Sequence, residues 1–363
     1  MIRVLHIVTY MGRGGLETML MNYYRHIDRT RVQFDFLVHR AERADYDDEI
    51  DALGGVIYRL PRLVPWSKSY LAELNGFFAS HTEYKIVHVH QDCLSSVILK
   101  SAQANGVPVR IAHSHSSGQD KNFKYPIKLL YRRSIPRYAT LLFACAKDAG
   151  DWMFCGAPYQ IVNNAIDVGA YTYDPSKREK IRCQLGVKDE FVIGHVGRFM
   201  YPKNHPFLID IFAALLKKEH NAILLLVGDG EEMPKIRAKA QDLGIDDKVR
   251  FLGVRSDVAE LMQAMDLFAF PSLYEGLPVT MVEAQAAGLP CVVSNVIPHD
   301  AYLTNLVTPV SLSESAETWA AEILKNSNVQ RIDRYSEIAA HSFDITVEAK
   351  KLQEFYLHVY EQN

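Results

Sequence analysis

Short runs of apolar residues alternate with longer stretches of mixed polarity along the whole chain. The runs have the length of buried strands, and the stretches between them have the composition of helices that cover a sheet. The ten expected strands are Val4–Val8, Phe34–Val38, Ile86–Val89, Val109–Ala112, Leu141–Ala144, Phe191–Val196, Ala222–Val227, Val249–Leu252, Leu267–Phe270 and Pro290–Ser294. Alternating strand and helix units of this kind predict an α/β fold with parallel sheets covered on both faces.

The number of expected strands and the chain length both indicate two domains. A chain of 363 residues is longer than one ordinary core requires, and these strands suit two sheets of about five better than one sheet. A charged, proline-containing stretch interrupts the strands between Asn163 and Glu190. The last segment is expected to form an amphipathic helix, Ile345–Glu361, that packs across the first domain. We therefore predict two Rossmann-like, doubly wound domains, which are residues 1–165 with 344–363 and residues 166–343.

The overall composition is typical of a soluble globular protein. Hydrophobic residues make up 48% and charged residues 23%, and the net charge of -3 argues against a nucleic-acid binder. The charge is uneven, because residues 1–166 carry a net charge of +5 and the remainder carries -8. Only the first half is therefore expected to meet an anionic surface or ligand.

Cysteine usage and hydropathy predict the compartment. The five cysteines have no paired spacing, which predicts buried thiols in a reducing environment. We expect no signal peptide, because polar residues from Thr9 to Glu17 follow the short apolar start at once, and no apolar run is long enough to cross a membrane. We therefore expect a cytoplasmic protein.

A segment from Ser272 to Pro290 directly follows one of the expected strands of the second half. Pro278 suits the first position of a helix, because its missing N–H costs nothing there. Gly288 followed by Pro290 gives a stop signal. The segment therefore predicts a short helix that begins in a strand-to-helix crevice, where ligands bind in open α/β sheets.

Two glutamates, Glu275 and Glu283, lie before and within this expected helix. The free amides of Val279 and Thr280 at its start can bind an anion such as a diphosphate. One carboxylate could then bind a sugar and the other a ribose, with the diphosphate between them. The alternative is a solvated pair of glutamates on an amphipathic helix.

A second segment, His195–His205, combines two cationic side chains with the end of a strand. Arg198 can bind phosphate oxygens through two hydrogen bonds, and Lys203 adds a point charge. Such charges can neutralise the charge that develops on a leaving diphosphate. The alternative is an exposed basic loop without a ligand.

Together these segments resemble the donor site of retaining glycosyltransferases of family 4, which have the two-domain GT-B fold. The resemblance covers nearly the whole chain and rests on the E-x7-E segment and on a G-R-x4-K-N segment. It implies that Glu283 binds the nucleotide ribose, that Glu275 contacts the transferred sugar, and that Arg198 and Lys203 hold the diphosphate. Pro278 stands where many members have glycine, and it removes one backbone donor.

The loop Gly12–Glu17 follows the first strand and resembles the Gly-Gly loop of the same family. The resemblance implies that amides near Gly14 and Gly15 approach the donor phosphate, although a plain turn is the alternative. It also places the nucleobase near Val254. The remaining donor contacts that it implies are Gly276, Leu277, Val279 and Thr280.

Two pairs of histidines occur near the ends of strands in the first half. His113 and His115 are expected to project to opposite sides, and the resemblance places one of them near the reacting sugar, with His115 preferred. No metal is expected, because no cysteine or carboxylate with suitable local spacing accompanies them. His88 and His90 are expected at a sheet edge, with His90 a candidate acceptor contact and His113 a second one.

The stretch 121–137 contains six basic residues and no acidic one, with apolar positions between them. Lys124, Lys128 and Arg132 are the candidate contacts with a membrane surface or a lipid phosphate. The alternative is a basic amphipathic helix packed on its own domain.

The resemblance implies a retaining hexosyltransferase that moves a sugar from a nucleotide-sugar, expected to be a UDP-sugar, to a glycan or lipid-linked acceptor. Exopolysaccharide or capsule synthesis is the expected process, and no cofactor is expected besides the donor substrate. The alternatives are a nucleotide-sugar epimerase, a phosphorylase with a pyridoxal-phosphate lysine, and a non-catalytic scaffold that retains the nucleotide pocket. Intact Arg198, Lys203, Glu275 and Glu283 argue against the scaffold.

Overall fold

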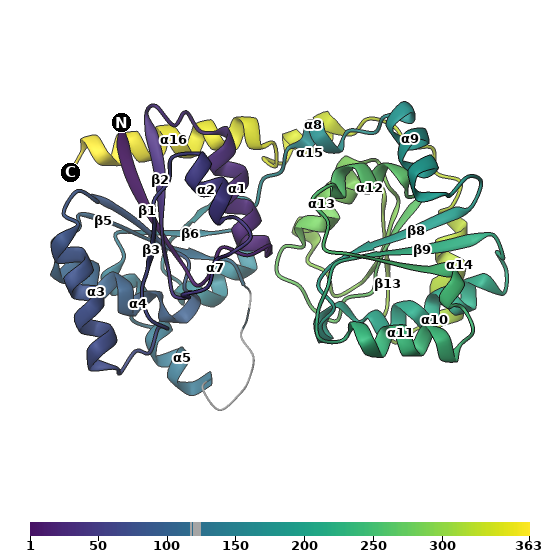
Figure 1. The fold of residues 1–363 in the computed structure, drawn as a ribbon, viewed down its shortest axis with the longest axis horizontal. Helices are drawn as coiled ribbons and strands as arrows, with labels where there is room; N and C mark the ends of the chain where they lie inside the picture. Colours follow the sequence, from purple (N-terminus) through teal and green to yellow (C-terminus); the bar gives the residue numbers. More distant parts are fainter. Residues whose placement is uncertain (117, 119–124) are drawn as a thin grey trace. The chain divides into compact units, whose positions relative to one another are not determined.

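A computed structural model describes residues 1–116, 118 and 125–363 of the chain. The chain forms two compact units: unit 1 is Met1–Ile166 with Ser342–Asn363, and unit 2 is Asp167–His341 (Figure 1). The sequence predicts 1–165 with 344–363 for the first and 166–343 for the second. Each unit is described by itself below.

Unit 1 is built on a parallel sheet of seven strands in the described part of the chain, in the order β3-β2-β1-β4-β5-β6-β7. The order reverses between β1 and β4, as in doubly wound sheets. The strands are β1 (Ile2–Val8), β2 (Val32–Val38), β3 (Ile57–Arg59), β4 (Ile86–Val89), β5 (Val109–Ser114), β6 (Leu141–Ala144) and β7 (Gln160–Ile161).

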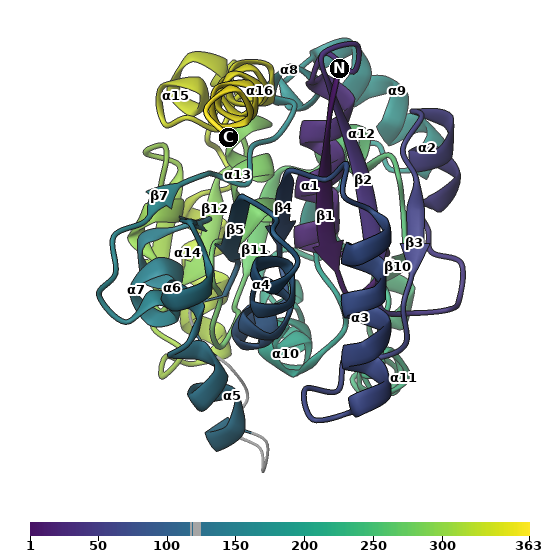
Figure 2. The same cartoon turned by 90° about the vertical axis from the view of Figure 1, so that its left-hand side faces the viewer.

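Helices cover both faces of this sheet (Figure 2). One buried apolar cluster lies between the sheet and α1 and α16, and another lies between the sheet and α3, α4 and α7. The helices of unit 1 are α1 (Gly15–His26), α2 (Asp47–Ala52), α3 (Lys68–Ser80), α4 (Ser95–Ala104), α5 (Tyr125–Arg132), α6 (Ile135–Tyr138), α7 (Lys147–Phe154) and α16 (Ile345–Glu361), with a 3-10 turn at Asp92–Leu94.

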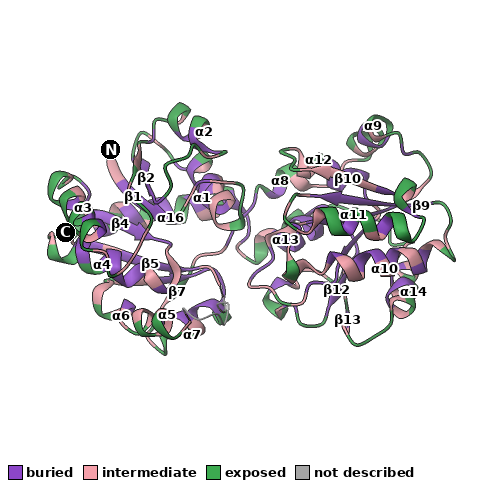
Figure 3. Cartoon of the chain, turned by 60° about the horizontal axis from the view of Figure 1, so that its bottom comes forward, coloured by how far each residue is buried: buried purple, intermediate pink, exposed green. Residues whose placement is uncertain are grey.

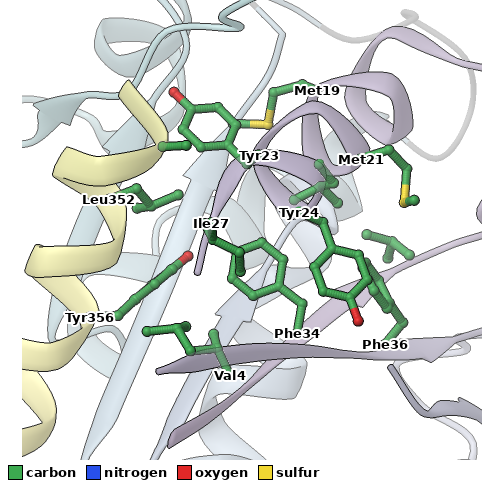
Figure 4. Close-up of a cluster of buried hydrophobic side chains, with 14 of the residues drawn as sticks. Val4, Met19, Met21, Tyr23, Tyr24, Ile27, Phe34, Phe36, Leu352 and Tyr356 are labelled. Carbon is green, nitrogen blue, oxygen red and sulfur yellow. The ribbon is translucent and has the colours of Figure 1, made fainter. Parts of the chain in front are cut away.

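The C-terminal helix α16 belongs to the core of unit 1, although the rest of that unit lies before Asp167 in the sequence. Ile345, Ala349, Leu352 and Tyr356 are buried at helical spacing. Figure 4 shows Leu352 and Tyr356 beside the side chain of Tyr23 from α1. The predicted amphipathic helix that packs on the first domain is therefore confirmed.

Unit 2 contains a second parallel sheet, of six strands in the described residues, in the order β10-β9-β8-β11-β12-β13. Figure 3 shows its strands largely buried, with exposed positions on the surrounding helices. The strands are β8 (Phe191–Val196), β9 (Ala222–Val227), β10 (Val249–Gly253), β11 (Leu267–Phe270), β12 (Cys291–Ser294) and β13 (Val307–Val310).

The helices of unit 2 are α8 (Val168–Tyr171), α9 (Pro175–Leu185), α10 (His205–Leu216), α11 (Met233–Asp242), α12 (Val258–Ala264), α13 (Val279–Ala286), α14 (Ala316–Lys325) and α15 (Tyr335–Ala340). Short 3-10 turns occur at Tyr201–Lys203, Asp246–Lys248 and His299–Ala301. Helices α10, α11 and α14 share an apolar cluster with one face of the sheet, and its largest fully buried side chain is Trp319.

The α/β prediction is confirmed, and the strand count is too low. The sheets also contain β3, β7 and β13, of which β3 and β7 lack an apolar run and β13 holds a proline. All three lie at sheet edges, where the demand for apolar residues and for backbone donors is weakest. The prediction of buried thiols is wrong for Cys155 and Cys183, which are exposed.

Candidate active site

In unit 2, the loop after β8 is held against the loop after β11. The amide of Leu273 donates to the carbonyl oxygen of Pro202 at 2.7 Å, and Asn204 Nδ2 donates to the carbonyl oxygen of Pro271 at 3.1 Å. Strands β8 and β11 are neighbours and parallel, so their carboxyl ends and the loops that follow them lie on the same edge of the sheet. This arrangement brings the two motifs of the second half together.

The side chains of Lys203 and Glu275 form an ion pair across these loops. Lys203 Nζ lies 2.7 Å from Glu275 Oε1, and the two side chains are only 16% and 13% exposed. Nζ also lies 4.8 Å from the centre of the Phe270 ring, a cation–π contact. The pair therefore presents adjacent positive and negative groups at the edge of the sheet, each held in place by the other.

Arg198 differs from Lys203 because its side chain is exposed. The described part of the chain provides it with no ion-pair partner, so its guanidinium is available to an anionic ligand. Its backbone is fixed by close packing of glycines: a Cβ on Gly228, which has a φ of +133°, would collide with the carbonyl oxygen of Gly197. Glycine at position 228 is therefore required by backbone contact as well as by conformation.

Helix α13 begins one residue later than the sequence predicts. The expectation that Pro278 is the first helical residue is wrong, since it is the N-cap with a φ of -75° and a ψ of 98°. The φ of proline fits both positions, so spacing alone does not separate them. No side chain caps the helix, and among the described residues the buried hydroxyls of Ser272 and Thr280 have no partner. The amides of Val279 and Thr280 thus open the helix beside unused polar groups.

Glu283 lies inside α13 and is 8% exposed. Burial raises its pKa to about 7, and a hydrogen bond from the Tyr171 hydroxyl acts in the opposite direction. The same burial, together with the nearby Glu283, raises the pKa of Tyr171 well above its ordinary value. A carboxyl group kept away from water with one neutral donor is suited to bind further hydroxyl groups.

The other predicted donor contacts surround these groups in unit 2. Gly276 and Leu277 join Glu275 to α13, and Leu277 is 8% exposed. Val254 follows β10 at the same edge of the sheet and is 59% exposed. The structure thus places all donor candidates of the second half on the carboxyl edge of one sheet or on the helix beside it.

In unit 1, the glycine loop leads from β1 into α1. Gly14 is the N-cap of α1 and has no side chain to cap the helix, whereas the Glu17 carboxylate bonds to its own backbone amide in the first turn. A Cβ on Gly15 would meet nothing within 4 Å. The first residues of the helix therefore offer backbone amides to an anion, beside the carboxylate of Glu17, which lies close to Gly14.

His113 and His115 do not project to opposite sides. Their ring centres are 4.1 Å apart, because side chains two positions apart along a strand share a face. The expectation of a sheet-edge position for His88 and His90 is also wrong. Both are buried, and β4 lies between β1 and β5 in the interior of the sheet.

These four histidines join His6 of β1 in a cluster that is buried except for the partly exposed His115. His90 Nδ1 lies 2.8 Å from His115 Nε2, and His90 Nε2 lies 3.2 Å from His6 Nδ1. His88 Nε2 lies 3.2 Å from His113 Nδ1, and the Tyr356 hydroxyl lies 2.6 Å from His88 Nδ1. Burial lowers the pKa of every ring in the cluster, so all are neutral near pH 7.

Ring nitrogens of this cluster lie close enough together to be candidates for a metal site. In His6, His88 and His90, and again in His90, His113 and His115, three ring nitrogens lie within 4.8 Å of one another. No metal is expected from the sequence because no suitable ligand lies near His113 and His115 along the chain. Strands β1, β4 and β5 are neighbours in the sheet and bring the additional histidines together.

The basic stretch forms two short helices, α5 and α6. In α5 no residue is buried, and Ile127 and Leu130 are 42% and 66% exposed. Lys124 lies outside the described residues, whereas Lys128 lies on α5. Arg132 is partly committed to its own unit, because Nη1 donates to the carbonyl oxygen of Trp152 at 2.7 Å.

Sequence reasoning missed three residues of these sites: Tyr171, His6 and Tyr356. Tyr171 and Tyr356 are far in sequence from Glu283 and His88, and no local pattern marks them. His6 carries a signal, because it is the single polar residue in the expected strand Val4–Val8. Its importance depends on strand order, which pairs it with His88 in register.

Comparison with known proteins identifies the class. Residues 13–169 match the family described as Glycosyltransferase Family 4, and residues 177–337 match Glycosyl transferases group 1. EpsF of Bacillus subtilis (strain 168), which bears the name of a glycosyltransferase, is 37% identical over 92% of this chain and 89% of its own length. The chain therefore belongs to the glycosyltransferases, with a family 4 region followed by a group 1 region.

Two further similarities agree with this family. The Escherichia coli UDP-Gal:alpha-D-GlcNAc-diphosphoundecaprenol alpha-1,3-galactosyltransferase is 26% identical over 61% of each chain. The structure of Anabaena Alr3699/HepE in complex with UDP and glucose has a TM-score of 0.77 and 20% identity, covering 98% of this chain and 99% of that one. This likeness confirms the GT-B fold, with a Rossmann-like sheet in each unit. Among the described residues, no helix is long and apolar enough to cross a membrane.

Proposed function

We propose that this glycosyltransferase moves a sugar from a nucleotide-sugar, a UDP-sugar, to a glycan or lipid-linked acceptor with retention at the anomeric carbon. One arrangement in unit 2 carries the proposal. Glu275, which is paired with Lys203, lies in the loop that leads into α13, the N-terminus of α13 has no side-chain cap, and the same helix carries the buried carboxyl group of Glu283. A hydroxyl-binding group, an anion-binding helix end and cations thus occur together, as a nucleotide-sugar requires.

The names of relatives support the donor and the acceptor class. The similar Escherichia coli protein is named for transfer from UDP-Gal to a diphosphoundecaprenol-linked sugar. The HepE structure contains UDP and glucose. A further relative, CapH of Staphylococcus aureus, is named for capsular polysaccharide biosynthesis. We therefore propose a UDP-sugar as donor and assembly of an exopolysaccharide or capsule as the process.

In the proposed complex, the donor diphosphate binds Arg198, Lys203 and the amides of Val279 and Thr280. The ribose hydroxyls donate to Glu283, and the sugar binds Glu275. Because Lys203 and Glu275 already form an ion pair, the lysine can contact phosphate while it still orients the glutamate that holds the sugar. Gly276, Leu277 and the backbone near Val254 complete the donor site.

In the proposed transfer, the bonds that break and form belong to the donor and the acceptor. The bond between the anomeric carbon and the phosphate oxygen breaks, and its electron pair leaves with the nucleoside diphosphate. The acceptor oxygen bonds to the same face of that carbon, and its proton passes to the donor phosphate. Arg198 and Lys203 stabilise the leaving group, Gly14 and Gly15 add amides, and His115 positions the sugar. His90 and His113 remain candidate acceptor contacts.

We propose that this reaction uses no metal ion and no cofactor, because cationic side chains supply the charge. The chain contains one Asp-x-Asp triplet, Asp45 to Asp47, which is the spacing of a metal-binding motif. Both carboxylates have other partners, since Asp45 accepts the amide of Arg13 and Asp47 pairs with Arg59. Each carboxylate thus already has a partner within unit 1.

We further propose that the protein works at the cytoplasmic face of a membrane, with α5 as the contact. The exposed apolar side chains of α5 lie among basic residues, a combination that favours an anionic lipid surface. Lys124 and Lys128 would contribute charge to this contact. Arg132 contributes less, because it is bonded within unit 1.

A panel of nucleotide-sugars tests the activity. We expect a UDP-sugar to raise the melting temperature most, and transfer from that donor to give an α-linked product when the donor is α-linked, as read by NMR of the anomeric proton. An inverted product would contradict the retaining reaction. An isomerised nucleotide-sugar formed without any acceptor would identify an epimerase.

Replacing Glu283 by Ala tests the donor site directly. We expect the affinity for UDP, measured by calorimetry, to fall by at least about tenfold, as for loss of a hydrogen bond to a charged group. The control is Glu314→Ala, which removes an exposed carboxylate of unit 2. Unchanged UDP affinity in Glu283→Ala would place the ribose elsewhere.

A further inference from the structure

Five histidines gather on one face of the sheet of unit 1. His6 and His88 come from the adjacent strands β1 and β4, His113 comes from β5, and His90 and His115 directly follow β4 and β5. His6, His88, His90 and His113 are each no more than 4% exposed. Ordinary packing does not need so many imidazoles, since buried polar groups are tolerated only with partners. Among the described residues, His6 Nε2, His113 Nε2 and His115 Nδ1 are buried atoms without one.

We propose that His90, His113 and His115 form a binding site for a divalent transition-metal ion such as Zn²⁺, an ion that takes no part in the transfer and binds these rings in place of the sugar and acceptor contacts proposed above. Their ring nitrogens lie within 4.8 Å of one another, which small ring movements would bring to about 2.0–2.1 Å from one ion. A set of imidazole nitrogens without a carboxylate favours Zn²⁺, Cu²⁺ or Ni²⁺ over Mg²⁺ or Ca²⁺.

The hydrogen-bond pattern specifies which nitrogen of each ring can bind. His113 Nδ1 faces His88 at 3.2 Å, so its unpartnered Nε2 is the ligand atom. His90 Nε2 faces His6 at 3.2 Å, so Nδ1 is the ligand atom of this ring. His115 binds through Nδ1, which has no partner among the described residues, or through Nε2, which now lies 2.8 Å from His90 Nδ1.

His6 and His88 then orient the ligands without touching the ion. Metal-bound histidines usually use their second nitrogen in a hydrogen bond that fixes the ring. His88 has a further partner of this kind, because its Nδ1 lies 2.6 Å from the Tyr356 hydroxyl. Two of the three proposed ligands are therefore already oriented by a second histidine, His90 by His6 and His113 by His88.

The alternative group of His6, His88 and His90 is less suited to a metal ion. Both nitrogens of His88 are occupied, by the Tyr356 hydroxyl and by His113, and all three rings are buried. The proposed group contains His115, which is partly exposed. It therefore gives an ion access and leaves a coordination position open to water.

Metal binding by the whole chain tests the site without any reference to transfer activity. Protein stripped with a chelator is titrated with ZnCl₂ by calorimetry, and a second sample is loaded with Co²⁺. We expect saturable Zn²⁺ binding and the visible absorption of nitrogen-coordinated Co²⁺. His115→Gln should lower the affinity for Zn²⁺ by at least about tenfold, whereas His220→Gln, an exposed histidine of unit 2, should leave it unchanged.

Several results would overturn the assignment. Absence of saturable Zn²⁺ binding would do so, and so would wild-type affinity in a His115→Gln variant with a native circular dichroism spectrum. Loss of affinity in His6→Gln but not in His115→Gln would assign the ion to the other group. If His115→Gln does not fold, histidine nitrogen NMR of the wild type decides: the resonances of His90, His113 and His115 must shift most with Zn²⁺.

Discussion

Glu283 is a carboxyl group whose environment opposes its charge. It is 8% exposed and its pKa is raised to about 7 by burial. The neutral form is therefore favoured in the folded protein at acidic pH, and the charged form must be held without full hydration above neutral pH. A bound ribose would supply hydroxyl donors to the charged carboxylate and so stabilise it.

The stability of the ligand-free protein should depend on this group. The folded pKa of about 7 lies above the ordinary value of 4.5, so the stabilisation is complete below 4.5 and is lost as the pH rises through about 7. The shift corresponds to about 3 kcal/mol in the free energy of unfolding. We expect Glu283→Gln to unfold at higher urea concentration than wild type at about pH 8, and the difference to shrink at about pH 5.

Urea unfolding at a series of pH values measures this dependence. The matched control is Glu314→Gln, because Glu314 is an exposed carboxylate of the same unit. Curves for Glu283→Gln and wild type that stay parallel across the range would show that Glu283 titrates normally.

Arg198 and Lys203 should matter to transfer more than to folding. Replacing both by Ala removes the cations proposed to stabilise the leaving diphosphate, and we expect the rate of transfer to fall by at least about 100-fold. Circular dichroism should remain native, since neither side chain belongs to an apolar core. Lys217→Ala with Lys218→Ala removes the same charge from exposed positions and should retain activity. Near-normal turnover in the Arg198 and Lys203 variant would refute their role.

At the scale of elements, the site of unit 2 depends on loops that follow adjacent parallel strands. The loop after β8 carries Arg198 and Lys203, and the loop after β11 carries Glu275. The backbone of the first loop packs on the turn after β9 at Gly228 and Gly230, with no room for a Cβ at either position. The position of the cations is thus set by backbone contacts between elements.

Gly228→Ala should disturb this arrangement. The new Cβ would collide with the carbonyl oxygen of Gly197, and the φ of +133° is strained for any L residue. We expect a loss of about 2 kcal/mol or more in the free energy of unfolding, together with weaker binding of UDP. Gly186→Ala is the control, because Gly186 has a φ of +60° and open space around it. Equal effects of the two variants would show that the collision is absorbed elsewhere.

At the scale of the whole molecule, charge and exposed apolar surface are unevenly distributed. Residues 1–166 carry a net charge of +5 and the remainder -8. Helix α5 of unit 1 adds two exposed apolar side chains to this basic half. Unit 1 therefore has the properties expected of the part that meets an anionic lipid surface.

Vesicle binding tests this contact. We expect the protein to sediment with vesicles that contain anionic lipid, less so at high salt, and Leu130→Glu to reduce the bound fraction several-fold because it places a charge in the apolar contact. Leu243→Glu is the control, since Leu243 is exposed to 45% in unit 2. Equal binding by both variants would separate α5 from any membrane contact.

The sequence by itself determined the α/β class, the buried central strands and the motifs proposed to bind the donor. Apolar runs and glycine or proline signals are local, and a helix such as α16 follows from its own periodicity. Motifs such as Glu275 to Glu283 lie within one strand-loop-helix unit, so their placement at a strand end needs no distant contact. Short edge strands such as β3 and β7 have no apolar run in the sequence, because they form by pairing with a neighbouring strand.

Only the tertiary structure decided which distant groups meet. Strand order placed His6, His88 and His113 together, and packing of α8 on α13 brought Tyr171 to Glu283. The physical reason is that partners of buried polar groups are chosen by adjacency in the sheet and between helices, which sequence distance does not encode. The motifs were therefore readable along the chain, whereas the pKa of Glu283 and the histidine cluster depended on the fold.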